Sequence, residues 1–431
     1  MNVALFENPR VKKIAFPLQW TDDRQDAFLA FTALFQFVVL MVQLFVLHLF
    51  RLSGTAQSIL RLFAIAACAV PIVVALPILW KRRALLFFGT YGVAGLLFLL
   101  TAVFFPPVRP YLISLAFELL CMCLPGFLCF ASIRNMEAVH PVLLKLAFAN
   151  FLLGVLFALF SFTGILPGES YSMSFSYYLL FPACYFVYRF HTDRKKRLLV
   201  FALLCAAFML LLGSRGPLVT FAAYLVLSTA FSLKFNKRTV VTLAVLLAVG
   251  IVCLIFYRQI LAAVYEIFRM LGIESRTLLL MKEGELFTHD SGRGNIYTLL
   301  IRKILEQPLF GYGIGGDRAL RGGSYAHNLF VELFTDFGLV LGSVVVVFLL
   351  GLLLRCFWTA KNRLWFLLWG CVGFIPLMVS GSYLSEANFW LLLGLCAHIL
   401  RAGKVPAFEK GRRFPHAEEK SADHHGTVSA N

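Results

Sequence analysis

Long apolar segments separated by short polar ones make up most of this chain. A segment of about 20 residues can cross a bilayer core of about 30 Å as a helix, because a helix rises about 1.5 Å per residue. The apolar residues do not alternate with polar ones, which favours helices over a membrane barrel. We expect an all-α polytopic membrane protein with twelve spans, at roughly 27–50, 59–80, 84–105, 112–133, 142–164, 171–190, 197–213, 217–233, 239–257, 339–357, 364–383 and 386–400.

Composition supports this interpretation. The chain is 60% hydrophobic and 14% charged, with a mean hydropathy of +0.83, whereas soluble domains average about 25% charged residues. The net charge is +17, but the basic residues occupy every second loop, for example 81–83 and 194–197. This pattern is the positive-inside signal and predicts that both termini are cytoplasmic. We therefore expect a multi-pass membrane protein and no nucleic-acid partner; the family resemblance described below implies the bacterial inner membrane.

The spans divide the chain into five parts. Residues 1–26 form a basic cytoplasmic arm, 27–257 hold the first nine spans, 258–338 form a large loop outside the cytoplasm, 339–402 hold the last three spans, and 403–431 form a disordered cytoplasmic tail. Apolar residues at helical spacing predict helices within the loop at 259–271 and 295–307. This loop carries most of the residues that could support chemistry.

Cysteine and histidine patterns argue against a metal site. All ten cysteines lie within or beside apolar segments, where cysteine behaves as a small core residue. The predicted outer loops contain neither a cysteine pair nor a metalloprotease histidine pattern. We expect no metal and no cofactor.

The first candidate site is the turn from Ser214 to Pro217, which precedes span eight on the outer side. Pro217 suits the first turn of a helix, and the start of a helix attracts anions. Arg215 adds a planar cation that binds phosphate through two hydrogen bonds, and Ser214 and Gly216 flank it. The alternative is a turn arginine that meets only lipid phosphate.

Two further stretches of the loop are rich in glycine. In Ser291–Gly294, glycines on both sides of Arg293 would let a ligand approach the backbone closely. The segment Gly311–Gly316 matches GxGxxG, but no strand precedes it, so it is not a dinucleotide fingerprint. We interpret it as a tight turn that positions the following residues, and we place Gly313 among the substrate-binding residues.

The segment from Tyr325 to Gly338 holds the best candidate base. Asn328 is a suitable N-cap, and Asn328, Glu332 and Asp336 would share one helix face. His327 lies just before this helix and could act as a general base near neutral pH. The alternative is a histidine that only holds the loop. We include Tyr325, Asn328 and Glu332 in the substrate-binding set.

Together these stretches resemble the O-antigen ligase / O-antigen polymerase family of bacterial membrane glycosyltransferases. The resemblance is carried by SRG at 214–216, SGR at 291–293, PLFGYGIGG at 308–316 and YAHNLFVELFTDFG at 325–338, and it is best between Leu210 and Leu350. It implies a C-type glycosyltransferase fold and a metal-independent enzyme. Such enzymes transfer a glycan from an undecaprenyl-diphosphate carrier to an acceptor hydroxyl at the outer face of the membrane.

The resemblance also implies roles. Arg215 and Arg293 would hold the donor diphosphate, His327 would orient or deprotonate the acceptor hydroxyl, and Asn328 would fix the helix start. Polymerases use another lipid-linked glycan as acceptor and ligases use the lipid A core; both remain open, with polymerisation favoured. The other implied partners are membrane lipids and chain-length regulator or flippase proteins. A transporter or flippase and a non-catalytic scaffold are the alternatives from other classes.

Overall fold

The computed structural model describes residues 17–163, 165–166, 173–212, 215–232, 257–270 and 293–402. Within these residues all regular structure is helical, as the sequence predicts. In the described part of the chain, five helices are long and apolar enough to cross a membrane, and three shorter apolar helices accompany them. The predicted span 239–257 lies almost entirely outside the described residues, so the count of twelve spans remains a prediction.

The helices follow the predicted segments closely. They are α1 (Asp22–Leu49), α2 (Gly54–Phe104), α3 (Arg109–Phe117), α4 (Leu124–Ser132), α5 (His140–Phe162), α6 (Met173–Asp193), α7 (Lys196–Leu212), α8 (Arg215–Ser232), α10 (Tyr257–Met270), α12 (Arg293–Glu306), α13 (Gly316–Leu320), α14 (Leu329–Thr359), α15 (Arg363–Val379) and α16 (Ala387–Ala402). A π-helical turn, Glu118–Cys123, joins α3 to α4. The loop helices predicted at 259–271 and 295–307 correspond to α10 and α12.

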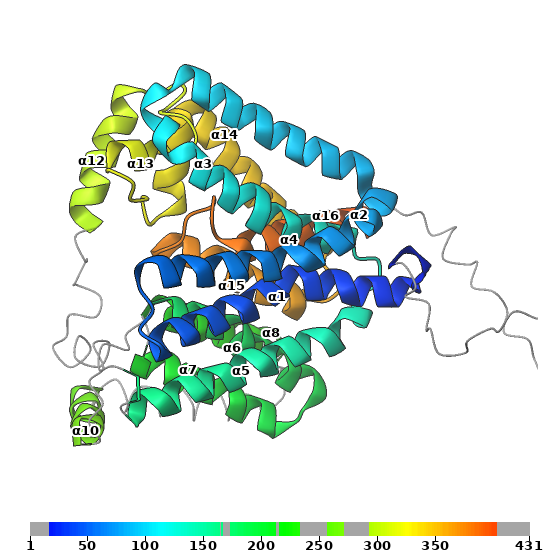
Figure 1. Ribbon diagram of the computed structural model, residues 1–431, viewed down its shortest axis with the longest axis vertical. Coiled ribbons are helices and arrows are strands. Elements are labelled where there is room, and N and C mark those ends of the chain that lie inside the picture. The colour runs from blue at the N-terminus through cyan, green and yellow to red at the C-terminus, as the bar shows by residue number, and fades with distance from the viewer. Residues whose placement is uncertain are drawn as a thin grey trace, which may run out of the picture.

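Two helices contain a break where the sequence predicts a boundary. Arg83 has non-helical backbone angles inside α2, and the two halves of α2 run in different directions on either side of it (Figure 1). Gly338 breaks α14 in the same way, with φ 74°. The second half of α14 therefore begins at 339, which is where the tenth span was expected.

The core lies where the helices pack side by side. Trp369 on α15 is fully buried, and its ring centroid lies 4.9 Å from that of Phe130 on α4 and 5.4 Å from that of Phe181 on α6. The cysteines behave as predicted core residues: among those the structure describes, all are free and only Cys121 is exposed. Aromatic and small side chains thus fill the space between the helices.

The two ends of the bundle differ in character. In Figure 1, α12, α13 and the connection between α1 and α2 lie on one side of the bundle, and the start of α1 and the bend of α2 lie on the opposite side. At that opposite end Arg82 is buried and forms ion pairs with Asp22 and Asp26, and Arg134 pairs with Asp22 at 2.9 Å. These pairs tie the bend of α2 to α1. We call the end that carries α12 and α13 the site end.

Candidate functional site

The glycine-rich segment before α13 is a tight turn that docks on the first half of α14. The Tyr312 amide donates to the Thr335 carbonyl and the Gly313 amide to the Asp336 carbonyl, both at 2.9 Å. A Cβ atom on Gly311 would lie 2.4 Å from the amide nitrogen of Gly338. Glycine at 311 and at 338 is therefore required for this close approach of the two backbones.

A buried ionic network holds the site end together, and Arg318 lies at its centre. Its Nη1 atom lies 2.7 Å from Asp317 Oδ1 and 2.5 Å from Glu332 Oε1, and the Ser382 hydroxyl bonds to both Arg318 and Glu332. Burial alone would lower the pKa of Arg318, but the two carboxylates raise it well above its ordinary value. The guanidinium therefore stays charged and joins α13, α14 and the turn between α15 and α16.

Asp336 extends this network to the same turn. The Tyr383 hydroxyl donates to Asp336 Oδ2 at 2.7 Å, and the Gly316 amide donates to Asp336 Oδ1 at 3.0 Å. Glu332 and Asp336 thus share one helix face, as their spacing predicts, and both are fully buried. The turn at 380–386 is consequently fixed against α14.

His327 lies between the turning segment and α14. It has a left-handed backbone with φ 60°, which is uncommon for a residue other than glycine. Asn328 caps α14 as predicted, because its side chain accepts from the amides of Phe330 and Val331 at 3.0 and 3.3 Å. The strained backbone turns the imidazole back onto Tyr325, and the two ring centroids are 4.2 Å apart. The cap fixes the direction in which His327 leaves the helix.

The environment of His327 keeps its imidazole neutral. Burial lowers the pKa of His327, the charges of Arg293 and Arg321 lower it further, and a hydrogen bond to the Ser380 backbone partly opposes them. Its Nδ1 atom is buried and has no hydrogen-bond partner among the described residues. A buried ring nitrogen without a partner is costly, so a bound group that hydrogen bonds to Nδ1 would remove this cost.

Ser380 is the point where separate segments of the chain meet. The Tyr325 hydroxyl donates to the Ser380 carbonyl at 2.7 Å, and the Ser380 hydroxyl shares a hydrogen bond with the Tyr177 hydroxyl on α6. At the start of α8, a Cβ atom on Gly216 would lie 2.8 Å from the Tyr177 hydroxyl oxygen and 3.7 Å from Ser380 Oγ. Glycine at 216 therefore allows α8 to begin directly beside these groups.

The structure thus brings together most of the residues singled out in the sequence. Gly216 and Tyr325 border Ser380, and the Tyr325 ring also packs against the His327 ring. Asn328 follows His327 and donates to the Met378 carbonyl, and the charge of Arg293 acts on His327. The backbone of Arg215 starts α8 beside Gly216, while its side chain and Ser214 lie outside what the structure describes.

Two predicted residues occupy supporting positions. Gly313 packs against Phe105 and Thr101 at the end of α2, and Glu332 directs its carboxylate into the Arg318 network. Their contact with a substrate remains a prediction.

Sequence reasoning missed Tyr177 and Ser380. Ser380 lies in a turn that the sequence marks only as poor in charge, and Tyr177 looks like any aromatic residue near the end of a span. Neither position has a local signal, because each acquires its neighbours only through packing of distant helices.

A large apolar groove runs from the site toward the opposite end of the bundle. It has a volume of about 900 Å³ and lies between the second half of α2, α14 and α16. Leu329, Leu333 and Tyr383 line it near the site, and Leu85, Leu352 and Leu400 line it at the far end. Its lining is almost wholly apolar, which suits a long hydrocarbon chain.

Comparison with known proteins identifies a family for part of the chain. Residues 199–346 match the family model described as O-Antigen ligase, a stretch that includes Arg215, Arg293 and His327. No curated protein matches the chain significantly. The family match confirms the resemblance found in the sequence motifs.

Proposed function

Because residues 199–346 carry an O-antigen ligase domain, we propose that this protein is a glycosyltransferase of the bacterial inner membrane. It transfers a glycan from an undecaprenyl-diphosphate carrier to an acceptor hydroxyl at the outer face of that membrane, with both termini in the cytoplasm. The observation that carries the proposal is His327, whose Nδ1 has no partner among the described residues and whose pKa is lowered by burial and by Arg293 at the start of α12. The start of α8, with Arg215, lies beside Ser380.

His327 supplies the base. In the proposed mechanism the proton of the neutral imidazole lies on Nε2, and Nδ1, which has no partner in the described part of the chain, carries the free electron pair. The acceptor hydroxyl gives its proton to Nδ1 and its oxygen bonds to the anomeric carbon of the donor sugar. The bond from that carbon to the diphosphate oxygen breaks, and the diphosphate leaves with the bonding electrons.

The leaving diphosphate needs positive charge. Arg215 is the first residue of α8 and Arg293 is the first residue of α12, so each arginine adds its charge to the positive end of a helix dipole. Each charge-assisted hydrogen bond to phosphate contributes roughly 1.5–3 kcal/mol. Two such groups stabilise the developing charge without requiring a metal ion.

The apolar groove fits the lipid part of the donor. It begins at Leu329, the residue after the Asn328 cap, and continues along α14 to Leu352. A polyprenyl chain in this groove would place its diphosphate at the site end, next to His327. The hydrophobic burial of such a chain contributes about 25 cal/mol per Å².

The acceptor decides between two members of the family. We favour polymerisation of lipid-linked repeat units, with ligation to the lipid A core as the alternative; chain-length regulators and flippases are the expected protein partners. The polar network and His327 lie at one end of the bundle and not at its middle, which favours an enzyme over a transporter, because transporter sites lie near the membrane midplane.

The test is transfer in vitro. Full-length protein is mixed with an undecaprenyl-diphosphate oligosaccharide in the presence of EDTA, and glycan lengthening or transfer to an added lipid acceptor is followed. The His327→Ala variant should lose at least about 10²-fold in rate, the usual contribution of a general base. Transfer by His327→Ala at the wild-type rate refutes the assigned base.

A pair of glycine variants tests the geometry around Ser380. Gly216→Ala places a methyl group 2.8 Å from the Tyr177 hydroxyl oxygen, whereas a Cβ atom at Gly370 meets nothing within 4 Å. We expect Gly216→Ala to lower the transfer rate at least tenfold, since a shift of about 1 Å in a catalytic group is costly. Gly370→Ala should leave the rate unchanged; equal effects of the two variants contradict the assignment.

A further inference from the structure

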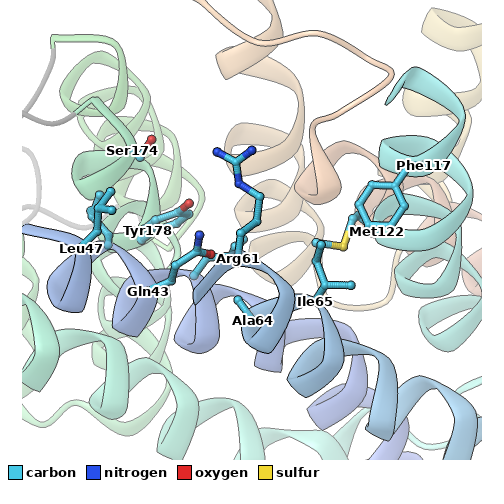
Figure 2. A pocket seen from close by; sticks show the side chains of 11 residues that line it. Gln43, Leu47, Arg61, Ala64, Ile65, Phe117, Met122, Ser174 and Tyr178 are labelled. Carbon is cyan, nitrogen blue, oxygen red and sulfur yellow. The ribbon is translucent and has the colours of Figure 1, made fainter. Parts of the chain in front are cut away.

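A second pocket lies on the other side of the site and contains an arginine that the sequence analysis passed over. It is bounded by α1, α2, the segment from α3 to α4, and α6, and it has a volume of about 280 Å³. Figure 2 shows the Arg61 side chain extending into the space between Ser174 and Tyr178 on one side and Phe117 and Met122 on the other. We call this the Arg61 pocket.

Arg61 has no hydrogen bond or ion pair with any other residue that the structure describes. It lies about two turns after the start of α2 at Gly54, within a segment apolar enough to cross a membrane. An arginine inside such a segment costs up to roughly 2.5–3.5 kcal/mol unless its charge is compensated. Arg61 is exposed, so an anion from its surroundings, such as a lipid phosphate, can pair with it and offset this cost.

The direction of the side chain places that anion near the membrane surface. Side chains of a helix tilt toward its N-terminus, and the start of α2 lies at the site end (Figure 1). Arg61 therefore reaches from the apolar layer toward the site end, as an arginine does when it meets a lipid phosphate.

The lining of the pocket matches a lipid headgroup together with the beginning of its chains. Gln43, Ser174 and Tyr178 supply polar groups around the guanidinium, and Leu44, Leu47 and Ile65 supply an apolar wall. A free phosphate ion would leave that apolar wall unused. The combined chemistry therefore favours a lipid that bears a phosphate group.

The pocket adjoins the His327 site and is separate from the apolar groove. Tyr178 lines the pocket, while the preceding residue, Tyr177, shares its hydroxyl hydrogen bond with Ser380. The groove is lined by the second half of α2 and by α14 and α16, whereas the pocket is lined by α1, the first half of α2 and α6, and no residue lines both. The two cavities are therefore separate, so each can hold a lipid of its own.

We propose that the Arg61 pocket binds the phosphate-bearing headgroup of the second lipid substrate, the acceptor, and that Arg61 pairs with its phosphate. This inference rests on the proposed function, because it assigns the Arg61 pocket to the second of the two lipid substrates of that reaction. The acceptor then approaches past α6 while the donor lies along α14. Arg61 determines which acceptors bind and does not take part in bond making.

The binding test uses full-length protein in detergent and native mass spectrometry. Phosphatidic acid is the phosphate-bearing probe, phosphatidylcholine is the uncharged comparison, and inorganic phosphate is the lipid-free comparison. Wild-type protein should retain one phosphatidic acid molecule at a concentration about tenfold lower than Arg61→Gln does, because a charge-assisted phosphate contact is lost. Arg61→Lys should fall between the two, since it keeps the charge without the planar fork.

Arg302→Gln is the matched control. It removes the same charge from an exposed position on α12, where Arg302 pairs only loosely with Glu306 at 3.6 Å, and it should bind phosphatidic acid like the wild type. An equal loss of phosphatidic acid binding in Arg61→Gln and Arg302→Gln overturns the proposal, because it indicates that the lipid is attracted by the general positive charge of the surface. Displacement of the lipid by inorganic phosphate at equal concentration also overturns it, in favour of a free-phosphate site.

A kinetic arm separates this inference from the proposed function. In the transfer assay, Arg61→Gln should raise the acceptor concentration needed for half-maximal rate about tenfold and leave that of the donor unchanged. If Arg61→Gln instead raises the donor concentration needed for half-maximal rate, the pocket does not bind the acceptor. If wild-type protein transfers no glycan, the proposed function fails, while the binding measurement still decides whether the pocket holds a phosphate-bearing lipid.

Discussion

Replacing Arg318 by methionine tests whether the buried network holds the site end together. The Arg318 side chain is 5% exposed and its partners Asp317 and Glu332 are 0% exposed. Arg318→Met removes the charge but keeps a chain of similar length, so two carboxylates remain buried without a cation. Breaking a buried ion pair in this way costs about 3–5 kcal/mol, a large part of the roughly 5–15 kcal/mol that stabilises a typical fold.

The free energy of unfolding is measured in mixed micelles of a mild detergent and increasing sodium dodecyl sulfate. Adding Glu332→Gln to Arg318→Met should recover about 1–3 kcal/mol, because it removes one of the uncompensated charges and the two residues are in direct contact. Transfer activity should fall with stability, since Ser382 and the turn that carries Ser380 are held by the same network.

Arg302→Met on the exposed face of α12 is the control, with an expected effect below about 1 kcal/mol. The network does not stabilise the site end if the free energy of unfolding of Arg318→Met lies within about 1 kcal/mol of the wild-type value. The same conclusion follows if the double variant loses more unfolding free energy than the two single variants lose together. The reasoning from burial and pairing would then be wrong.

Two further predictions concern His327 and Gly338. Burial and the charge of Arg293 lower the pKa of His327 below its ordinary 6.5, so the transfer rate should be constant above about pH 6.5 and fall only at lower pH, as the imidazole takes a proton. Arg293→Gln should lower the rate and also shift this fall toward higher pH. Identical pH profiles of the variant and the wild type would show that Arg293 does not affect the pKa of His327. Gly338 has φ 74°, and a Cβ atom there would lie 2.7 Å from the Pro308 carbonyl oxygen, so Gly338→Ala should destabilise the protein by about 1–3 kcal/mol. Gly351→Ala in the same helix meets nothing within 4 Å and should be neutral or stabilise by up to about 1 kcal/mol, so similar unfolding free energies for the two variants would show that the break at Gly338 is not strained.

Most helix boundaries could be predicted because the signals are local. Apolar segments of about 20 residues, the cap at Asn328 and the break at Gly338 each depend on a few adjacent residues. The predicted start of the tenth span at 339 agrees with the second half of α14 for this reason. The bend at Arg83 follows from the same kind of signal, a short basic interruption of an apolar pattern.

Charge pairing was harder to predict than helix boundaries. Glu332 and Asp336 could be placed on one face by their spacing, but the sequence does not show that Arg318 and Tyr383 are their partners. Arg318 is one of several arginines in the loop, and only the fold distinguishes it from Arg302, which remains exposed. A charge therefore acquires its role from burial, which is a property of the assembled helices.

An all-helical membrane protein, a candidate base at His327 and candidate anion sites at Arg215 and Arg293 could be predicted from local signals, because periodicity and motif spacing are properties of short stretches of the chain. The packing of distant helices, in contrast, joins those segments through Ser380 and Tyr177, leaves His327 Nδ1 without a partner among the described residues, and places Arg61 at a pocket. These features depend on contacts between residues as far apart as α6 and α15. Such contacts are set by how helices pack, and the local pattern of a single chain does not specify them.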